Sequence, residues 1–179
     1  MYTQTVYLQT ADLRSEIVRG LAETARIVQP THMFSSVSYA SFSGCKFLYE
    51  ELLNAIPNWN DAKKDWLIGL DNGITEPKSL EYLANLPNSI VHLFDAAYLL
   101  ENNLRPRHKF HTKLYIFESL ENQAFGVFSS SANLTLSGLF LNTEQAFSAI
   151  FQQPFTDDEQ RLSMTVLDCT SHSRTNICQ

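Results

Sequence analysis

Two neighbouring stretches decide the fold of this chain: FHTKLYIF at residues 110–117 and VFSSSANLT at residues 127–135. The first stretch, and the apolar run at 124–128 that leads into the second, contain the aromatic and β-branched residues that favour strands. Only the short polar segment 118–123 separates these two apolar runs. We therefore predict two adjacent, paired strands, each with chemically reactive residues at one end.

The rest of the chain alternates between strand and helix patterns. The spacing predicts strands at 2–9, 31–41, 66–70, 90–94 and 146–151, helices at 11–27, 47–56 and 77–86, a turn at Ser43-Gly44, and a loop or short helix at 134–141. The run at 66–70 is apolar throughout, which is typical of a strand buried on both faces of a mostly parallel sheet. We expect a layered α/β/α domain over residues 1–168 with a mixed, largely parallel sheet. A helix beginning near Thr156 and a polar tail over 169–179 complete the prediction.

Composition narrows the class of protein. Nineteen acidic and thirteen basic residues give a net charge of -6, which excludes a chain whose whole surface binds nucleic acid but permits a local basic site. Three cysteines, Cys45, Cys169 and Cys178, are an odd number and indicate a reducing compartment rather than a disulfide framework. With neither a signal-peptide pattern nor a long apolar run, we expect a cytoplasmic protein with no membrane segment.

The basic residues gather in front of the first stretch. Four of the thirteen Lys and Arg residues lie close together, with two histidines among them: Arg105, Arg107, His108, Lys109, His111 and Lys113. A charge run of this kind is compatible with a solvated loop. It is also compatible with an anion site, most simply one for phosphate.

Three groups of residues carry the chemistry that the pattern indicates. His111 and Lys113 are two positions apart, so on a strand they project from one face. Ser131 and Asn133, also two apart, follow directly on the next strand and can both donate to an oxyanion. Glu144 stands at the start of a further strand, where its carboxylate can orient an imidazole. Each group alone is compatible with an ordinary structural role.

In this order, the motifs resemble the phospholipase D superfamily, and more narrowly its nucleases, which include metal-independent restriction endonucleases. The resemblance rests on FHTKLYIF at 110–117, VFSSSANLT at 127–135, SGL at 137–139 and NTE at 142–144. Upstream, SYASFSG at 38–44 and WLIGLD at 66–71 are compatible with the same fold.

The resemblance implies that His111 is the nucleophile and that Lys113 and Asn133 bind the scissile phosphate with help from Ser131. Two positions depart from the usual pattern, because Glu118 occupies the place of an aspartate and Ser130 that of a glycine. Since the nuclease branch uses a glutamate equivalent to Glu144, we expect Glu144 to be the partner of the histidine. Glu118 and Ser130 remain candidates for auxiliary roles.

One chain supplies one His-x-Lys pair, whereas sites of this superfamily use two. We therefore expect a homodimer that joins two half-sites, with one His111 attacking phosphorus and the other protonating the leaving oxygen. No metal or other cofactor is expected. Cys169, His172 and Cys178 do not match a zinc-binding spacing.

The expected substrate is DNA, with RNA also possible. Arg105, Arg107 and Lys109 are candidates for contacts to its phosphates. Because the chain is acidic, a separate DNA-binding domain or a motor ATPase is expected to supply targeting. Two alternatives remain open: a phospholipase, and a non-catalytic dimerisation or phosphate-binding module, which the departures at Glu118 and Ser130 favour.

Overall fold

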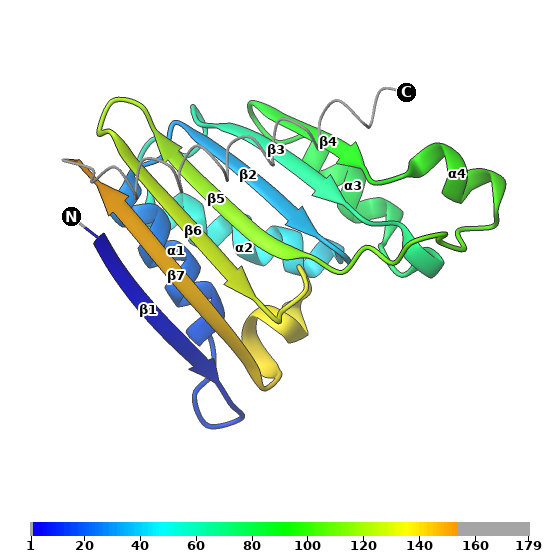
Figure 1. The fold of residues 1–179 in the computed structure, drawn as a ribbon, viewed down its shortest axis with the longest axis horizontal. Helices are drawn as coiled ribbons and strands as arrows, with labels where there is room; N and C mark the ends of the chain where they lie inside the picture. The colour runs from blue at the N-terminus through cyan, green and yellow to red at the C-terminus, as the bar shows by residue number, and fades with distance from the viewer. Residues whose placement is uncertain (1, 154–179) are drawn as a thin grey trace.

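A computed structural model of the chain describes residues 2–153, which form a single seven-stranded sheet (Figure 1). The strands lie in the order β1-β7-β6-β5-β2-β3-β4. Their bounds are β1 Tyr2–Gln9, β2 His32–Val37, β3 Lys63–Ile68, β4 Ser89–Leu93, β5 Lys113–Ser119, β6 Ala124–Ser130 and β7 Glu144–Gln152. The strands predicted from the apolar runs therefore exist, and the two decisive stretches are neighbours in the sheet.

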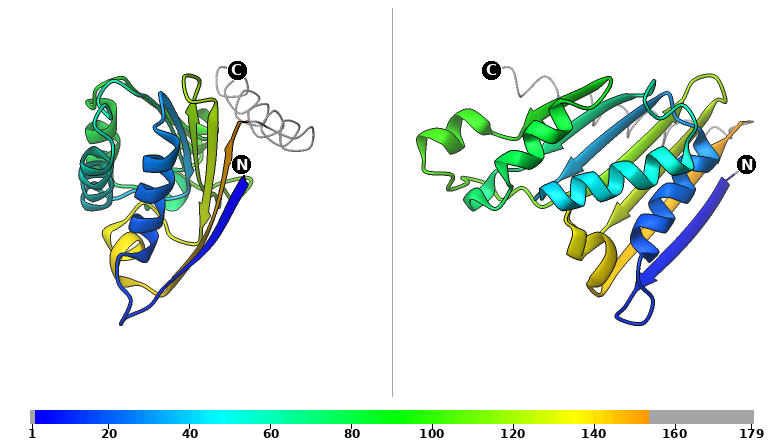
Figure 2. Two further views of the ribbon diagram at one scale, coloured as in Figure 1. Left: turned by 90° about the vertical axis from the view of Figure 1, so that its left-hand side faces the viewer. Right: turned by 180° about the vertical axis from the view of Figure 1, so that it is seen from behind.

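The three longer helices cover one face of this sheet, as Figure 2 shows in the edge-on view. They are α1 Glu16–Val28, α2 Phe42–Ala55 and α3 Pro77–Ala84. A fourth helix, α4, spans Ala96–Glu101 and lies beyond the β4 end of the sheet (Figure 1). Two single turns complete the described elements: a 3-10 turn at Asp71–Gly73 and a π-turn at Ser137–Leu141. The sequence pattern did not predict α4, which is too short to show a full apolar period.

The sheet is mixed, as predicted, but the prediction that it is largely parallel is wrong. Among the strands of residues 2–153, only β2-β3 and β3-β4 are parallel pairs, whereas β5, β6, β7 and β1 join antiparallel. The reason lies in the connections. A helix links each of the parallel strands to the next, while the short link between β5 and β6 permits only an antiparallel pair.

Both faces of the sheet are apolar at its centre. The helix-covered face packs the side chains of Trp66, Ile68 and Phe117 against the helices. On the other face, Leu67 and Ile116 belong to a smaller apolar cluster. Consecutive buried residues in β3 thus confirm that this strand is buried on both sides, which accounts for its unbroken apolar sequence.

The predicted turn at Ser43-Gly44 is instead the first turn of α2. The Ser41 hydroxyl accepts a hydrogen bond from the Gly44 N–H at 3.1 Å and so begins the helix. Gly44 is needed for packing, because a Cβ there would lie 2.5 Å from the carbonyl oxygen of Leu134. The start of α2 therefore packs directly against the segment that follows β6. The candidate site lies beside this contact.

Some predictions fall outside the described residues. They are the helix near Thr156, the domain boundary at 168 and the tail over 169–179. Among residues 2–153, no helix combines the length and apolar character that crossing a bilayer would require.

Candidate active site

His111 and Lys113 lie side by side at the start of β5. His111 is exposed and stands two residues before Lys113, the first residue of the strand. The Lys113 Nζ lies 3.2 Å from each ring nitrogen of His111, so its ammonium can donate to one of them at a time. The exposed imidazole is thus held against a lysine that is only 6% exposed.

The position of Lys113 changes its acid-base behaviour. Burial lowers the pKa of the Lys113 ammonium, and the negative charge of Glu144 partly opposes that shift. Glu144 is the first residue of β7, so a carboxylate from a third strand reaches the same region. A positive charge and a negative charge therefore lie close to the exposed imidazole.

Ser131 and Glu144 are hydrogen-bonded to each other. The Ser131 hydroxyl donates to Glu144 Oε2, and the Gln145 N–H donates to the Ser131 oxygen at 3.1 Å. The Ser131 N–H also donates to the Gln145 carbonyl at 2.9 Å. The residue after β6 is thus fixed to the start of β7, and the carboxylate contact of Glu144 that the structure resolves is to Ser131.

Asn133 lies two residues after Ser131, next to Leu134, which is hydrogen-bonded to residues 39 and 41. It is partly buried, and its Oδ1 has no hydrogen-bond partner within residues 2–153. Its backbone carbonyl accepts from the Thr135 N–H at 2.8 Å, and a Cβ on Gly138 would lie 2.8 Å from that oxygen. The Asn133 backbone is therefore tightly held, while its amide retains bonding capacity.

The topology explains why these segments meet. β5 lies between β6 and β2 in the sheet, and both neighbours run antiparallel to it. Their carboxyl ends therefore flank the amino end of β5, where Lys113 stands. The segment after β6 crosses this end and joins residues 39–41, with the Leu134 N–H donating to Tyr39 O and the Ser41 N–H donating to Leu134 O, both at 3.0 Å.

Three residues that the sequence reasoning did not select support the site. The first, Gln9, is fully buried and pairs in register with Glu144. Its side-chain amide donates to the carbonyls of Gly138 at 3.0 Å and Asn142 at 2.9 Å. It thereby holds the loop between Asn133 and Glu144. A buried glutamine at the end of an edge strand is too common a feature to identify this role from the sequence.

The second is Asp71, whose buried carboxylate accepts the N–H of Phe110 at 2.9 Å. The third is Ser38, which follows β2 and accepts a hydrogen bond from Lys113 Nζ at 3.2 Å. Both approach His111 and Lys113 from segments distant in sequence. Ser38 belongs to the upstream stretch SYASFSG, and no local signal distinguishes it from the other serines there.

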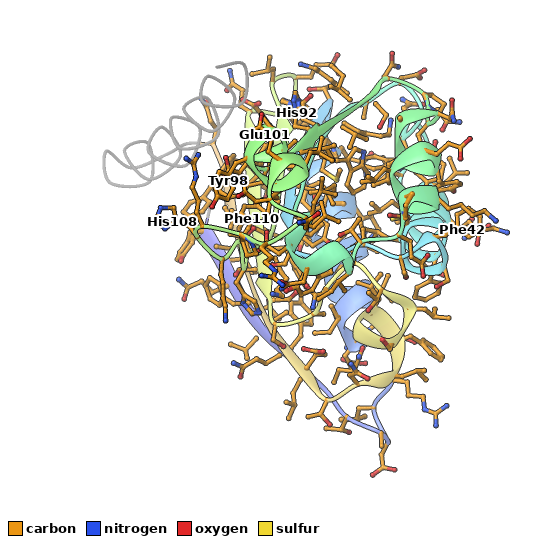
Figure 3. All side chains as sticks on the ribbon, turned by 90° about the vertical axis from the view of Figure 1, so that its right-hand side faces the viewer. Phe42, His92, Tyr98, Glu101, His108 and Phe110 are labelled. Carbon is orange, nitrogen blue, oxygen red and sulfur yellow. The ribbon has the colours of Figure 1, made fainter. Side chains whose placement is uncertain are left out.

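The basic residues before β5 differ from one another in their contacts. Arg107 donates two hydrogen bonds to Asp95, each 2.8 Å long, and its guanidinium lies 4.9 Å from the centre of the Tyr98 ring. Arg105 and Lys109 are exposed. Figure 3 labels Tyr98, which is on α4, and also His108 and Phe110 from the segment between α4 and β5, with His108 at the outer edge of the molecule in this view. Arg107 therefore makes a structural contact to Asp95, the residue before α4, and to Tyr98 on that helix.

Glu118 lies far from the other candidates. It is five residues after Lys113 on the same strand, so it projects from the opposite face near the opposite end. There it faces His32, with 3.6 Å between Oε2 and Nδ1. The structure therefore separates Glu118 from His111. Ser130 is nearer, at the end of β6, and its hydroxyl donates to Ala132 O at 3.4 Å.

No group of three or more His, Cys, Asp or Glu side chains within residues 2–153 is arranged to hold a metal ion. Cys169, His172 and Cys178 lie outside the described residues.

Similarity to known proteins is found at the level of structure. No protein-family model matches the sequence, and no curated protein matches it. Nuc from Salmonella typhimurium, a phospholipase D family member, superposes with a TM-score of 0.59 at 16% identity, over 98% of this chain and 93% of that chain. NucT from Helicobacter pylori gives a TM-score of 0.56 at 15% identity, over 98% of this chain and 95% of that chain. These matches span nearly the whole of each protein, so the chain has the fold of the phospholipase D superfamily.

Proposed function

We propose that this chain is a metal-independent phosphodiesterase, and specifically a DNA endonuclease that works as a homodimer through a phosphohistidine intermediate. The observation that carries the proposal is the contact between His111 and Lys113. An exposed imidazole lies against a buried ammonium group, 3.2 Å from it, and the charge of Glu144, which is hydrogen-bonded to Ser131, acts on that ammonium. Asn133 follows Ser131 by two residues. These are the nucleophile and the donors that cleavage of a phosphodiester needs.

The first chemical step transfers the phosphoryl group to protein. A neutral His111 ring nitrogen attacks phosphorus, so an N–P bond forms while the bond from phosphorus to the leaving oxygen breaks. The Lys113 ammonium and the Asn133 amide stabilise the negative charge on the phosphoryl oxygens. A protonated imidazole supplies the proton that the leaving alkoxide takes.

The second step regenerates the enzyme. The imidazole that gave up its proton accepts one from water, and the resulting hydroxide attacks phosphorus. The N–P bond then breaks and the phosphate monoester leaves. Since imidazole changes its charge near neutral pH, one copy can be neutral and the other protonated, as the first step requires. The copy that gave up its proton is then neutral and can accept one from water in the second step.

The second imidazole is proposed to come from a second copy of this chain. Within residues 2–153, the only histidine that contacts Lys113 is His111. A two-fold dimer would bring two such half-sites together without any new residue. Light scattering should give about twice the chain mass of 20.4 kDa, and a monomer at micromolar concentration would contradict this part of the proposal.

The decisive experiment measures cleavage of supercoiled plasmid and of bis(p-nitrophenyl)phosphate in excess EDTA. We expect both activities in the native chain and neither in His111→Ala. His108→Ala is the matched control, because it removes an exposed imidazole from the same segment. Loss of activity on addition of EDTA, or its survival in His111→Ala, would contradict the mechanism.

The same assays distinguish the alternatives. Cleavage of the small ester and of a phospholipid, but not of DNA, would indicate a phospholipase. Absence of all three activities would indicate a binding or dimerisation module. Parallel assays on single-stranded RNA separate the DNA and RNA assignments, and added DNA-binding or motor ATPase partners test whether targeting is supplied in trans.

The intermediate can be trapped directly. Rapid acid-free denaturation during turnover of a phosphate-labelled substrate should leave the label on the protein, in a bond that is stable to alkali and labile to acid. His111→Ala should carry none. Label on a serine in place of histidine would overturn the phosphohistidine step.

A further inference from the structure

Ser38 makes three hydrogen bonds to the segment that carries the candidate nucleophile. Its backbone N–H donates to the Thr112 carbonyl at 2.9 Å, and its hydroxyl donates to the same oxygen at 3.1 Å. The Lys113 Nζ in turn donates to the Ser38 hydroxyl at 3.2 Å. Ser38 therefore contacts both the backbone between His111 and Lys113 and the ammonium itself.

The direction of these bonds gives the Ser38 hydroxyl one role. A hydroxyl has one proton to donate and two lone pairs. Because its proton goes to Thr112 O, the Ser38 oxygen presents lone pairs to the Lys113 ammonium. It is a fixed acceptor, and being fully buried it does not exchange that contact for water.

The backbone of Ser38 is itself held in place. The Gly69 N–H donates to Val37 O at 3.0 Å, so the end of β3 lies along this segment. A Cβ on Gly69 would lie only 2.7 Å from the Ser38 carbonyl oxygen, and glycine is needed for that approach. The end of β3 thus packs closely against Ser38 and leaves little room for Ser38 to move away from Thr112.

The Lys113 ammonium has three N–H donors, and two of them make hydrogen bonds in the structure. One points to Ser38 and one to a ring nitrogen of His111. A lysine side chain is long and flexible, so with two donors held the direction of the third is also set. A neutral imidazole has one lone pair, which it needs to attack phosphorus, so the donor that points to His111 in the free chain is released when the ring attacks. That donor and the third one are then available to the phosphoryl oxygens, while the bond to Ser38 is kept.

We propose that Ser38 is a positioning residue, which holds the Lys113 ammonium so that the donors not bonded to Ser38 meet the phosphate. The inference rests on the proposed function as far as the phosphate is concerned. The contact with Lys113 is independent of that function and is tested separately.

The first test measures Lys113 without any substrate. In protein labelled at lysine, the Cε chemical shift of Lys113 is followed by NMR over an alkaline pH titration. The charged and titratable groups that the structure places on this ammonium are His111, before β5, and Glu144, from β7. Ser38→Ala leaves both in place and removes the acceptor, so the pKa of Lys113 should fall below its native value.

Ser35→Ala is the matched control. Ser35 is on β2, three residues before Ser38, and is equally buried, but its hydroxyl has no hydrogen-bond partner among the described residues. Its removal should leave the Lys113 titration unchanged. An unaltered titration in Ser38→Ala, or an equal fall in Ser35→Ala, would overturn the inference.

A second variant separates hydrogen bonding from packing. Ser38→Thr keeps the hydroxyl acceptor, adds a methyl group and introduces no titratable group. Its Lys113 titration should stay near the native one. A fall of the Lys113 pKa in Ser38→Thr equal to that in Ser38→Ala would assign the effect to packing and overturn the inference.

The link to phosphate is tested by kinetics on bis(p-nitrophenyl)phosphate. Removal of a hydrogen bond to a charged group should lower kcat/KM of Ser38→Ala about tenfold to a hundredfold, and its alkaline limb should move to lower pH. If the native chain lacks activity but the Lys113 titration shifts, the proposed function fails and the contact stands. If the native chain and Ser38→Ala cleave equally well, the positioning role fails and the proposed function stands.

Discussion

The N–H of Phe110 donates a hydrogen bond to the buried carboxylate of Asp71, with 2.9 Å between the nitrogen and Oδ2. Phe110 is the residue immediately before His111, so this bond fixes the backbone from which the candidate nucleophile projects. The other carboxylate oxygen, Oδ1, is buried and has no partner within residues 2–153. The segment from α4 to β5 is thus joined to the turn that follows β3.

Replacing Asp71 by alanine should remove the hydrogen bond that holds the Phe110 backbone. An unpaired buried N–H costs about 1–3 kcal/mol, and the looser backbone should lower kcat/KM by about tenfold or more. Asp71→Asn keeps an acceptor oxygen for Phe110 and should have a smaller effect. Steady-state kinetics and denaturant unfolding of both variants check this, and equal activity of Asp71→Ala and the native chain would contradict it.

The two candidate glutamates should behave differently. Glu144 contacts Ser131 and lies near Lys113, whereas Glu118 faces His32 at the other end of β5. We expect Glu144→Gln to lower cleavage of bis(p-nitrophenyl)phosphate by about ten- to a hundredfold, as removal of a charged hydrogen-bond partner does. Glu118→Gln should retain near-native cleavage. Similar decreases in both would show that the observed separation does not govern the chemistry.

The exposed cations Arg105 and Lys109 should contribute to DNA affinity in a way that Arg107 does not. Removing one lysine or arginine that binds a phosphate reduces the steepness of log affinity against log salt by about one. We expect that decrease for Arg105→Ala and for Lys109→Ala in binding titrations. Arg107→Ala breaks the pair with Asp95 and should chiefly lower the melting temperature. A slope change in Arg107→Ala alone would reverse this assignment.

Gln9 should affect the site through the loop that it holds. Gln9→Leu leaves the carbonyls of Gly138 and Asn142 without their buried donor, which should destabilise the fold by roughly 1–3 kcal/mol per unpaired group. The same change should reduce activity, because Asn142 leads into Glu144. Gln4→Leu, on an exposed position of the same strand, is the control. Unfolding curves and kinetics together test this expectation.

Lys64 gives the fold a defined pH dependence. It is fully buried, and its ammonium donates to Ala62 O at 2.6 Å and Pro87 O at 3.0 Å. Burial lowers the pKa of Lys64 to about 8, with partial opposition from Asp61. Because the unfolded chain then binds more protons than the folded chain between about pH 8 and 10.5, stability from this group rises with pH across that window.

The comparison with Lys64→Met isolates this contribution. Below about pH 8 Lys64 is charged in the folded chain, so the folded chain is destabilised by the full cost of a buried charge. Above about pH 10.5 Lys64 is neutral in both the folded and the unfolded chain, and this cost is absent. The free energy of unfolding of the native chain relative to Lys64→Met should therefore increase by up to roughly 3 kcal/mol between these limits. Denaturant titrations at several pH values measure it, and a pH-independent difference would contradict the expectation.

The sequence by itself determined the strands and the three longer helices, and it selected the residues of the candidate site. Apolar runs and turn signals located the strands, since local periodicity and propensity govern them. The spacing in His111-Thr112-Lys113 and Ser131-Ala132-Asn133 identified the candidate site, because residues two apart on extended chain share a face.

Only the tertiary structure decided how the strands are ordered and which distant residues support the site. The antiparallel half of the sheet follows from the pairing of β5, β6, β7 and β1, which no local pattern encodes. Pairing of the strands brings Ser38 onto Lys113 and Gln9 onto the loop before Glu144, and it separates Glu118 from His111. These relationships are contacts between segments far apart in the chain, and they arise when the chain packs into one sheet.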